Sequence, residues 1–272
     1  MDELKYTFMT DTLVKMLFVR HQHLLQKLIA QLLSIPFESI ERFVITNPEM
    51  PPESLGDKYC RLDINMVVDG RRINLEFQVE NEGNYPERAL FHWAREYSSS
   101  LPSGGNYRDL PQVIIISIVD FSLLSCEEYH SEFMALEVSR HTPLSEKLVM
   151  HFFELPKIPE LNNADDDLLL WLSLFKAKSE VELKRIEEME VPEMSEAIGA
   201  YRSITVSPEF KEAERLRAKA RHDEAQALLN ERIKMAREIA LSLTELNLSD
   251  EEIAKHTRLS IEDIRRLRRS ES

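Results

Sequence analysis

The most regular alternation of apolar and polar residues lies in the stretch 61–78, on both sides of Asp69-Gly70. Alternation with a period of two is typical of a strand that buries one face. An Asp-Gly pair favours a hairpin turn of type I′, because both central residues of that turn need a positive φ. The stretch therefore predicts a β-hairpin in which Val68 pairs with Arg71.

The two faces of the predicted hairpin differ in polarity. Counting along the ladder from the turn places Asp63 directly opposite Glu76, and Arg61 directly opposite Gln78. These four residues share a polar face that we expect to be exposed. The other face is expected in the core and carries Leu62, Ile64, Met66, Val68, Ile73, Leu75, Phe77 and Val79.

The two acids on the polar face indicate a candidate metal site. Carboxylates on directly opposed residues, with Cβ atoms about 4.5–5.5 Å apart, repel each other unless a positive charge lies between them. The pairing of Asp63 with Glu76 therefore points to a divalent cation, which takes oxygen ligands. The alternative is an ordinary exposed sheet face on which Arg61 and Arg72 balance the two acids, and the spacing alone favours neither interpretation.

Helical and strand patterns alternate along the rest of the first 157 residues. Helical spacing of apolar residues runs from Thr10 to the residues before Pro36, and Asp11 at its start is expected to be a first-turn acid facing the helix dipole, with an active-site role as the alternative. Residues 113–119 are all apolar except Ser117, as in a strand buried on both faces. Further strands are predicted at about 41–45, 132–138 and 147–154. This order predicts an α/β fold.

A helix that follows the hairpin, at about 87–101, has three basic residues on one side. Arg88, His92 and Arg95 are spaced by four and three residues, so they share a face that we expect to be solvated. Another face is expected to pack on the core and carries Leu90, Trp93, Ala94, Tyr97 and Leu101.

The chain divides into four predicted segments. Residues 1–157 form the α/β domain, and residues 158–207 form a helical extension packed on it. Residues 208–247 form a long charged helix, whose sparse apolar positions indicate either a solvated helix or a weak coiled-coil seam. Residues 248–272 form a tail of two short helices.

Two helix starts are visible in the tail. Ser249 with Glu252 has the spacing of a capping box, and Ser260 with Asp263 suggests a second start. Two short helices joined in this way resemble a helix-turn-helix, which would present basic side chains to DNA. The alternative is a capped helical tail whose arginines offset neighbouring acids. The basic residues of the second helix are Arg265, Arg266, Arg268 and Arg269.

Composition narrows the classes of function. The net charge of −14 argues against unspecific affinity for polyanions, so contact with nucleic acid needs a local basic surface or a bound metal ion. The sequence has no apolar run of membrane length and no signal-peptide pattern at its start. Cys60 and Cys126 lack metal-site spacing. We therefore expect a cytoplasmic protein with reduced cysteines and no membrane partner.

Asp63 followed by Glu76-Phe77-Gln78 across a hairpin resembles the signature of PD-(D/E)XK nucleases. The wider context resembles the Rpn-type recombination-promoting nuclease and transposase family, over about residues 5–155 and again in the tail at 248–254. The matching residues are Asp11 to Phe18, Lys58 to Asp63, Ile73 to Gln78, Tyr85, Arg88, Ala89, Trp93, Arg95, Tyr97, Gly105, Tyr107 and Val113 to Phe121.

This resemblance implies a fold, an activity and a set of site residues. The implied fold is a PD-(D/E)XK nuclease-like core, a mixed central sheet flanked by helices. The implied activity is DNA cleavage in the bacterial cytoplasm with Mg²⁺ or Mn²⁺ and no organic cofactor, linked to recombination or transposition of mobile elements. Asp63 and Glu76 would hold the metal ion, Gln78 would complete the catalytic set, and Arg88 and Arg95 become candidates for phosphate contact.

Gln78 departs from the general PD-(D/E)XK pattern, in which lysine is usual, although glutamine is the usual residue in the branch resembled. A glutamine can orient a water molecule but adds no positive charge. Arg61, across the hairpin, could add that charge or form an ion pair with Glu76. Two functions stay open: an active DNA endonuclease, and a nuclease-fold DNA-binding accessory protein that does not cleave. A homodimer also stays open, because cutting both strands takes two sites.

Overall fold

The computed structural model describes residues 3–47, 63–161, 166–244, 246 and 248–270. These residues fall into two compact units, with residues 3–47 and 63–214 in the first and residues 215–270 in the second. The four-segment division of the sequence stays a prediction. Within the described residues, no helix combines the length and the apolar character that crossing a bilayer requires.

The first unit is built on a six-stranded mixed sheet. The strands are β1 (Phe43–Ile45), β2 (Ile64–Val68), β3 (Arg71–Gln78), β4 (Val113–Val119), β5 (His130–Leu136) and β6 (Pro143–Glu154). Their spatial order is β1-β2-β3-β4-β6-β5, with parallel pairing of β3 to β4 and of β4 to β6 and antiparallel pairing elsewhere. Every residue of β4 is buried, as its nearly unbroken apolar run predicts. The strands β3 and β4 therefore form the centre of the unit.

The central hairpin has the predicted turn and register. Asp69-Gly70 has φ values of 48° and 80°, the positive values that a type I′ turn needs. Val68 pairs with Arg71, and the ladder continues without a shift to the beginning of β2. The local sequence therefore determines this register.

The predicted burial of the hairpin is right on one face and wrong on the other. The described core-face positions are buried except Val79, which is 50% exposed because β3 has ended at Gln78; Leu62 lies outside the described residues. On the polar face, Asn74 is 5% and Glu76 4% exposed, contrary to prediction. The reason is helix α3 (Tyr85–Ser99), which packs across this face of the sheet.

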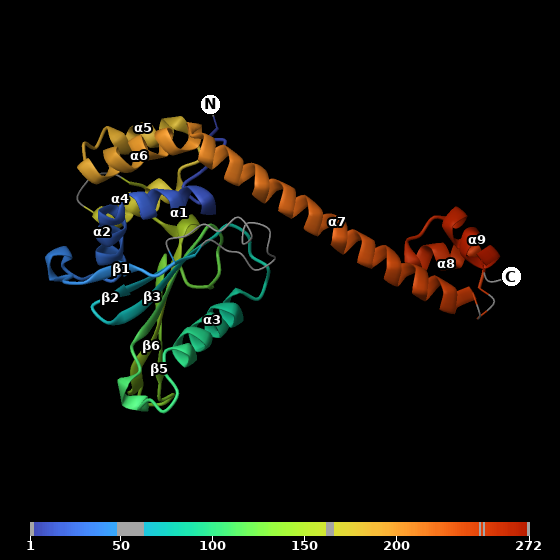
Figure 1. Cartoon of the computed structure of the whole chain (residues 1–272), viewed down its shortest axis with the longest axis horizontal. Coiled ribbons are helices and arrows are strands. Elements are labelled where there is room, and N and C mark those ends of the chain that lie inside the picture. Colours follow the sequence, from blue (N-terminus) through green and yellow to red (C-terminus); the bar gives the residue numbers. More distant parts are fainter. Residues whose placement is uncertain (1–2, 48–62, 162–165, 245, 247, 271–272) are drawn as a thin grey trace. The chain divides into compact units, whose positions relative to one another are not determined.

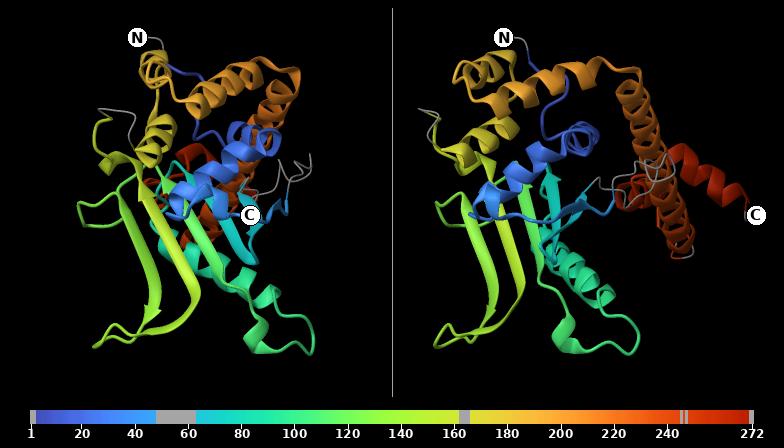
Figure 2. Two further views of the ribbon diagram at one scale, coloured as in Figure 1. Left: turned by 90° about the vertical axis from the view of Figure 1, so that its left-hand side faces the viewer. Right: turned by 60° about the vertical axis from the view of Figure 1, so that its left-hand side comes forward.

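Helices cover both faces of the sheet (Figures 1 and 2). The larger apolar core lies on the face opposite α3 and includes side chains from six helices. These are α1 (Asp11–Arg20), α2 (Gln22–Leu32), α4 (Asp167–Lys176), α5 (Glu180–Glu187), α6 (Pro192–Val206) and, through Phe210, the beginning of α7 (Pro208–Thr244). Short 3-10 turns lie at Phe37–Ser39, Tyr107–Asp109 and Leu155–Lys157. The sheet is thus the middle layer of the first unit.

The single helical pattern predicted from Thr10 onward is two helices in the structure. The break is at His21, whose φ of −120° and ψ of 65° are not helical. The ring of His21 contacts Glu196 of α6, with 2.9 Å between Nδ1 and Oε1. Apolar spacing continues across the break because both helices bury one side in the same core, so the sequence pattern alone did not reveal it.

The second unit consists of α7, α8 and α9. Helix α7 (Pro208–Thr244) starts in the first unit and is 37 residues long. It is followed by α8 (Asp250–Thr257) and α9 (Ile261–Ser270). The predicted capping box at the start of α8 is present, with Ser249 and Glu252 exchanging hydrogen bonds. A small apolar core holds the three helices together at Ala240, Ile253 and Ile264.

Candidate active site

Asp63 lies immediately before β2 and is held through its backbone carbonyl. That oxygen accepts hydrogen bonds from Asn47 Nδ2 at 2.9 Å and from Lys15 Nζ at 3.2 Å. Asn47 also accepts from the backbone N–H of Asn65, at 2.8 Å, which ties the segment before β2 to the strand. The side chain of Asp63 accepts from Asn74 Nδ2, at 2.7 Å, across the hairpin. The backbone of Asp63 and one oxygen of its carboxylate are therefore held in place.

Glu76 occupies the centre of the sheet and is held by α3. Its Oε2 accepts a hydrogen bond from the Tyr85 hydroxyl at 3.2 Å. Its Oε1 lies 3.0 Å from Nδ1 of His92. The carboxylate is 4% exposed, so its charge is largely removed from water. Since burial of an unpaired carboxylate is costly, this position calls for positive charge nearby.

Two buried oxygens on this face, Asn74 Oδ1 and Ser117 Oγ, have no hydrogen-bond partner among the described residues, and Glu76 Oε1 lies within ion-pair distance of His92 without a hydrogen bond. Asn74 and Glu76 are two residues apart on β3, and Ser117 is the register neighbour of Glu76 on β4, so the three side chains point to the same side of the sheet. Buried polar atoms are normally hydrogen-bonded. Unpaired oxygens are what a hard divalent cation takes as ligands.

The electrostatics of Asp63 also favour a cation here. Burial raises the pKa of the Asp63 carboxyl above its usual value of 3.8, and the charge of Glu76 raises it further. The hydrogen bond from Asn74 and the charge of Lys15 oppose this effect without cancelling it. A cation near both acids would relieve their repulsion.

These donors fit a hard metal ion. No group of three or more His, Cys, Asp or Glu in the described part of the chain is placed to hold one. Two carboxylates would therefore act together with neutral oxygens and water. Mg²⁺ commonly keeps several waters and uses one or two protein carboxylates, so this set suits Mg²⁺ better than a metal that prefers sulfur or nitrogen.

The third member of the predicted set, Gln78, is held at the end of β3. Its Oε1 accepts a hydrogen bond from Arg88 Nη2 at 3.2 Å, and its Nε2 donates to the Glu80 carbonyl at 2.8 Å. Arg88 also lies over the Tyr85 ring, 4.6 Å from its centroid. Arg88 therefore lies beside the glutamine and brings positive charge to the end of the strand.

The structure changes the interpretation of helix α3. His92, expected on a solvated face, contacts Glu76, while Arg95 is exposed as expected. The apolar face is shifted: Tyr85 and Ala89 are buried, whereas Leu90 is 49% exposed. The helix is thus rotated relative to the prediction, because it covers a polar part of the sheet and not only an apolar one.

The remaining residues that the sequence suggested for the site are Arg61, Asp11, Arg265 and Arg266. Arg61 lies outside the described residues. Asp11 is the first-turn acid of α1, four residues before Lys15. In the second unit, Arg265 is paired with Asp250 and Arg266 with Glu262.

Arg72, which could have balanced the two acids, contacts Glu96 of α3, with 2.5 Å between Nη1 and Oε1. Because Arg72 is paired with Glu96, it is not the residue that balances Asp63 and Glu76, as the alternative of an ordinary exposed sheet face assumed.

Lys15 is the site residue that sequence reasoning did not single out. It is 3% exposed although it carries a charge, and it reaches Asp63 from α1. A signal was present, because Lys15 stands alone within the apolar run from Leu13 to Phe18. A lysine is almost never fully buried unless it is paired, so its place in that run marks a specific partner.

Comparison with known proteins gives one match. A family model described as PD-(D/E)XK nuclease family transposase matches residues 8–231. No curated protein and no solved structure matches the chain.

Proposed function

Because the chain belongs to the PD-(D/E)XK nuclease family transposases, we propose that it is a divalent-metal-dependent endonuclease that hydrolyses phosphodiester bonds in DNA. The link to transposition comes with the family, and the fold is the mixed sheet flanked by helices that the family requires. The observation that carries the proposal is the pair of the half-buried Asp63 and the buried Glu76, beside oxygens that accept no hydrogen bond.

Asp63 and Glu76 are the residues that would hold the metal ion, with Mg²⁺ as the favoured ion and Mn²⁺ as a substitute. A divalent ion bound there supplies Lewis-acid activation of a water molecule at neutral pH. Asn74 orients the carboxylate of Asp63, and Tyr85 orients that of Glu76. The two acids are thereby preorganised, which saves the cost of ordering them during the reaction.

Lys15 and Arg88 provide the positive charge that Gln78 lacks. Lys15 is buried beside Asp63, where a charge acts more strongly than in water. Arg88 donates to Gln78 and forms an ion pair with Glu82 at the same strand end, so it would exchange Glu82 for a phosphate. Gln78 itself is left to orient water through its amide. A lysine reaching the site from a helix can replace a lysine on the strand, because charge near the developing anion is what the reaction needs.

A plasmid cleavage assay tests the proposal. The parent protein is expected to nick supercoiled DNA with Mg²⁺ and not with chelator. Asp63→Asn and Glu76→Gln should each lower the rate by at least about a hundredfold, because metal-ion catalysis contributes several kcal/mol and about 1.4 kcal/mol corresponds to a factor of ten. Glu80→Gln is the matched control, since its side chain is exposed close to the end of the same strand.

The second candidate is a DNA-binding accessory protein that has lost cleavage. The observation in its favour is Gln78, whose amide is hydrogen-bonded at both ends. A parent protein that binds DNA but never nicks it, with either metal, would establish this function. Equal nicking by the parent, Asp63→Asn and Glu76→Gln would instead show that the assigned site is wrong.

A further inference from the structure

Helix α7 carries a line of large apolar side chains that are exposed to solvent. Leu228 is 47%, Met235 59% and Ile239 51% exposed. They are separated by seven and four residues. With about 100° of rotation per residue, these intervals bring all three within about 40° of one direction. The three side chains therefore form a narrow seam along the helix, which we call the α7 seam.

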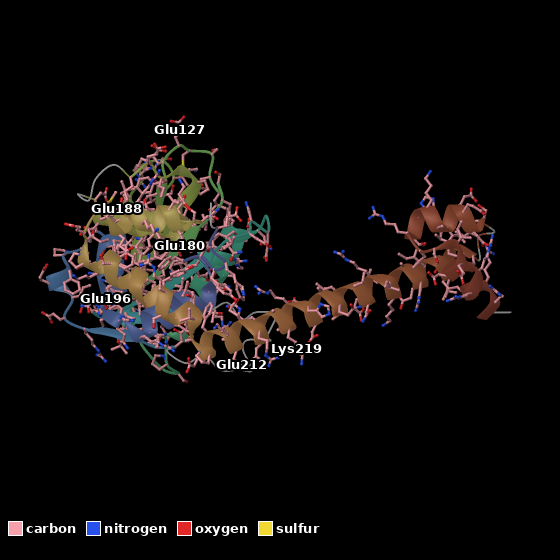
Figure 3. All side chains as sticks on the ribbon, turned by 90° about the horizontal axis from the view of Figure 1, so that it is seen from above. Glu127, Glu180, Glu188, Glu196, Glu212 and Lys219 are labelled. Atoms are coloured by element: carbon pink, nitrogen blue, oxygen red, sulfur yellow. The ribbon has the colours of Figure 1, made fainter. Side chains whose placement is uncertain are left out.

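The described residues of the second unit leave the α7 seam uncovered. Their small core uses a neighbouring side of the helix, at Ala240, which is 0% exposed, and at Leu243, which is partly buried against it. Figure 3 shows that the side chains of α7 just beyond the labelled Lys219 project from the helix, with no other described element of that unit beside them. Most helical stability in proteins comes from packing of an apolar face, so a long helix with an unpacked seam calls for a partner.

We propose that residues 225–244 of α7 pair with the same residues of a second copy of the chain as a parallel two-stranded coiled coil. The α7 seam has the heptad period that such pairing needs. The first core position of each heptad is filled by Ala225, Arg232 and Ile239, and the second by Leu228, Met235 and Ser242.

The charged residues next to the α7 seam favour a second copy of the chain as the partner and a parallel arrangement of the two helices. The positions that precede the first core position are Glu224, Glu231 and Glu238. In an antiparallel pair these acids would face their own copies and repel. In a parallel pair they face the residues one place after the second core position, which are Leu229, Ala236 and Leu243.

Arg232 explains why the partner is a second copy. A polar residue at a core position lowers stability but fixes the register. In the parallel pair, Arg232 of each helix lies beside Glu231 of the other, so both buried cations meet an acid. An unrelated apolar helix would bury Arg232 without that acid. Arg232 and the small residues Ala225 and Ser242 make the pairing moderate in strength, so we expect dimerisation to depend on concentration.

Sedimentation equilibrium of the full-length chain tests the pairing. The parent should pass from monomer to dimer as concentration rises, and Leu228→Glu with Ile239→Glu should stay monomeric. Gln226→Glu with Asn230→Glu adds the same charge on the far side of the helix and should dimerise like the parent. These side chains are exposed, so none of the variants should lose folding, which helical circular dichroism checks.

Direction is tested by cross-linking. In a variant with Cys60→Ser and Cys126→Ser, Met235→Cys should form an intermolecular disulfide, because identical core positions meet in a parallel pair. Lys234→Cys, next to it but outside the α7 seam, should not. A chain that is monomeric at every concentration, or a dimer that the double Glu variant leaves intact, overturns the proposal. A dimer in which Met235→Cys fails to cross-link overturns the parallel arrangement. None of these results depends on nuclease activity.

Discussion

The polar face of the central hairpin and the arginine-rich helix α9 differ in how far their charged side chains are exposed and in how they are paired. In the hairpin, Glu76 is 4% exposed, and its Oε1 lies 3.0 Å from His92 Nδ1 but accepts no hydrogen bond among the described residues. In α9, Arg266 is 68% exposed and pairs with Glu262 one turn away, and Arg265 pairs with Asp250. The hairpin thus contains a buried carboxylate that is incompletely hydrogen-bonded, whereas α9 pairs its exposed arginines with nearby acids.

This contrast separates the two regions by what their charges can do. An incompletely bonded buried carboxylate is unfavourable until a ligand joins it, so its retention points to a ligand. An exposed ion pair contributes about 0–1 kcal/mol and needs no ligand. The hairpin is therefore the stronger candidate for chemistry. DNA contact by Arg265 and Arg266 stays a prediction, and both residues would have to exchange a partner in the chain for a phosphate.

The largest effect on cleavage is expected when the buried charge of Lys15 is removed, and it tests whether the hairpin is the site of the chemistry. Lys15→Met keeps the volume but removes the buried charge next to Asp63, and should lower the cleavage rate by about 10²–10³-fold, as does loss of one electrostatic stabiliser elsewhere. Binding of Mn²⁺, measured by calorimetry, should be retained or tightened, since a repelling cation has gone. Lys15→Arg keeps the charge and should recover part of the rate. A Lys15→Met variant that cleaves at the parental rate would remove Lys15 from the mechanism.

A second effect concerns a polar pair that is bonded, the half-buried His130 and the buried His151, on the opposite face of the same sheet. His130 Nε2 and His151 Nδ1 lie 3.0 Å apart. Burial, and then the nearby His130, lower the pKa of His151 from 6.5 to about 4. The folded state thus binds this proton less readily than the unfolded state, so the stabilisation is complete above pH 6.5 and is lost as pH falls towards 4.

At about 1.4 kcal/mol per pKa unit, the stability loss linked to His151 amounts to about 3 kcal/mol. Urea unfolding between pH 7 and 4 measures it. His151→Gln should flatten the profile over this range, and His141→Gln, an exposed histidine at a turn, should leave the profile unchanged. If the profile of His151→Gln matches that of the parent, the histidine pair is not the cause.

The hairpin shows what the sequence could predict. Its register follows from Asp69-Gly70 and from strict alternation, both local properties, and the pairing of Val68 with Arg71 agrees. The burial of Glu76 could not be predicted in this way, because it depends on α3 packing across the sheet. His92 was missed for the same reason. A helical face that looks solvated in sequence can lie over polar groups of another element.

Replacing Gln78 by lysine gives a smaller effect. If Lys15 and Arg88 already supply the positive charge, Gln78→Lys should change the plasmid cleavage rate by less than about tenfold, equivalent to about 1.4 kcal/mol. In the Lys15→Met background the same change should restore activity, because the lysine then supplies the missing charge. A rise well above tenfold in the parent background would mean that the site lacks charge and that Lys15 serves only to hold Asp63.

The smallest effect is expected in α9, where the contrast can be broken. Arg265→Gln with Arg266→Gln removes two exposed ion pairs, so the free energy of unfolding should change by less than about 1 kcal/mol. DNA affinity, measured over a range of salt concentrations, decides whether these arginines have a second role. Each phosphate contact contributes about 0.9 to the slope of log K against log salt for duplex DNA. Because both side chains already have partners in the chain, we expect the slope to change by less than about 0.9, the contribution of one phosphate contact. A change of about 1.8, which corresponds to two lost contacts, would show that α9 binds DNA. Its ion pairs would then be the state of this surface in the absence of DNA.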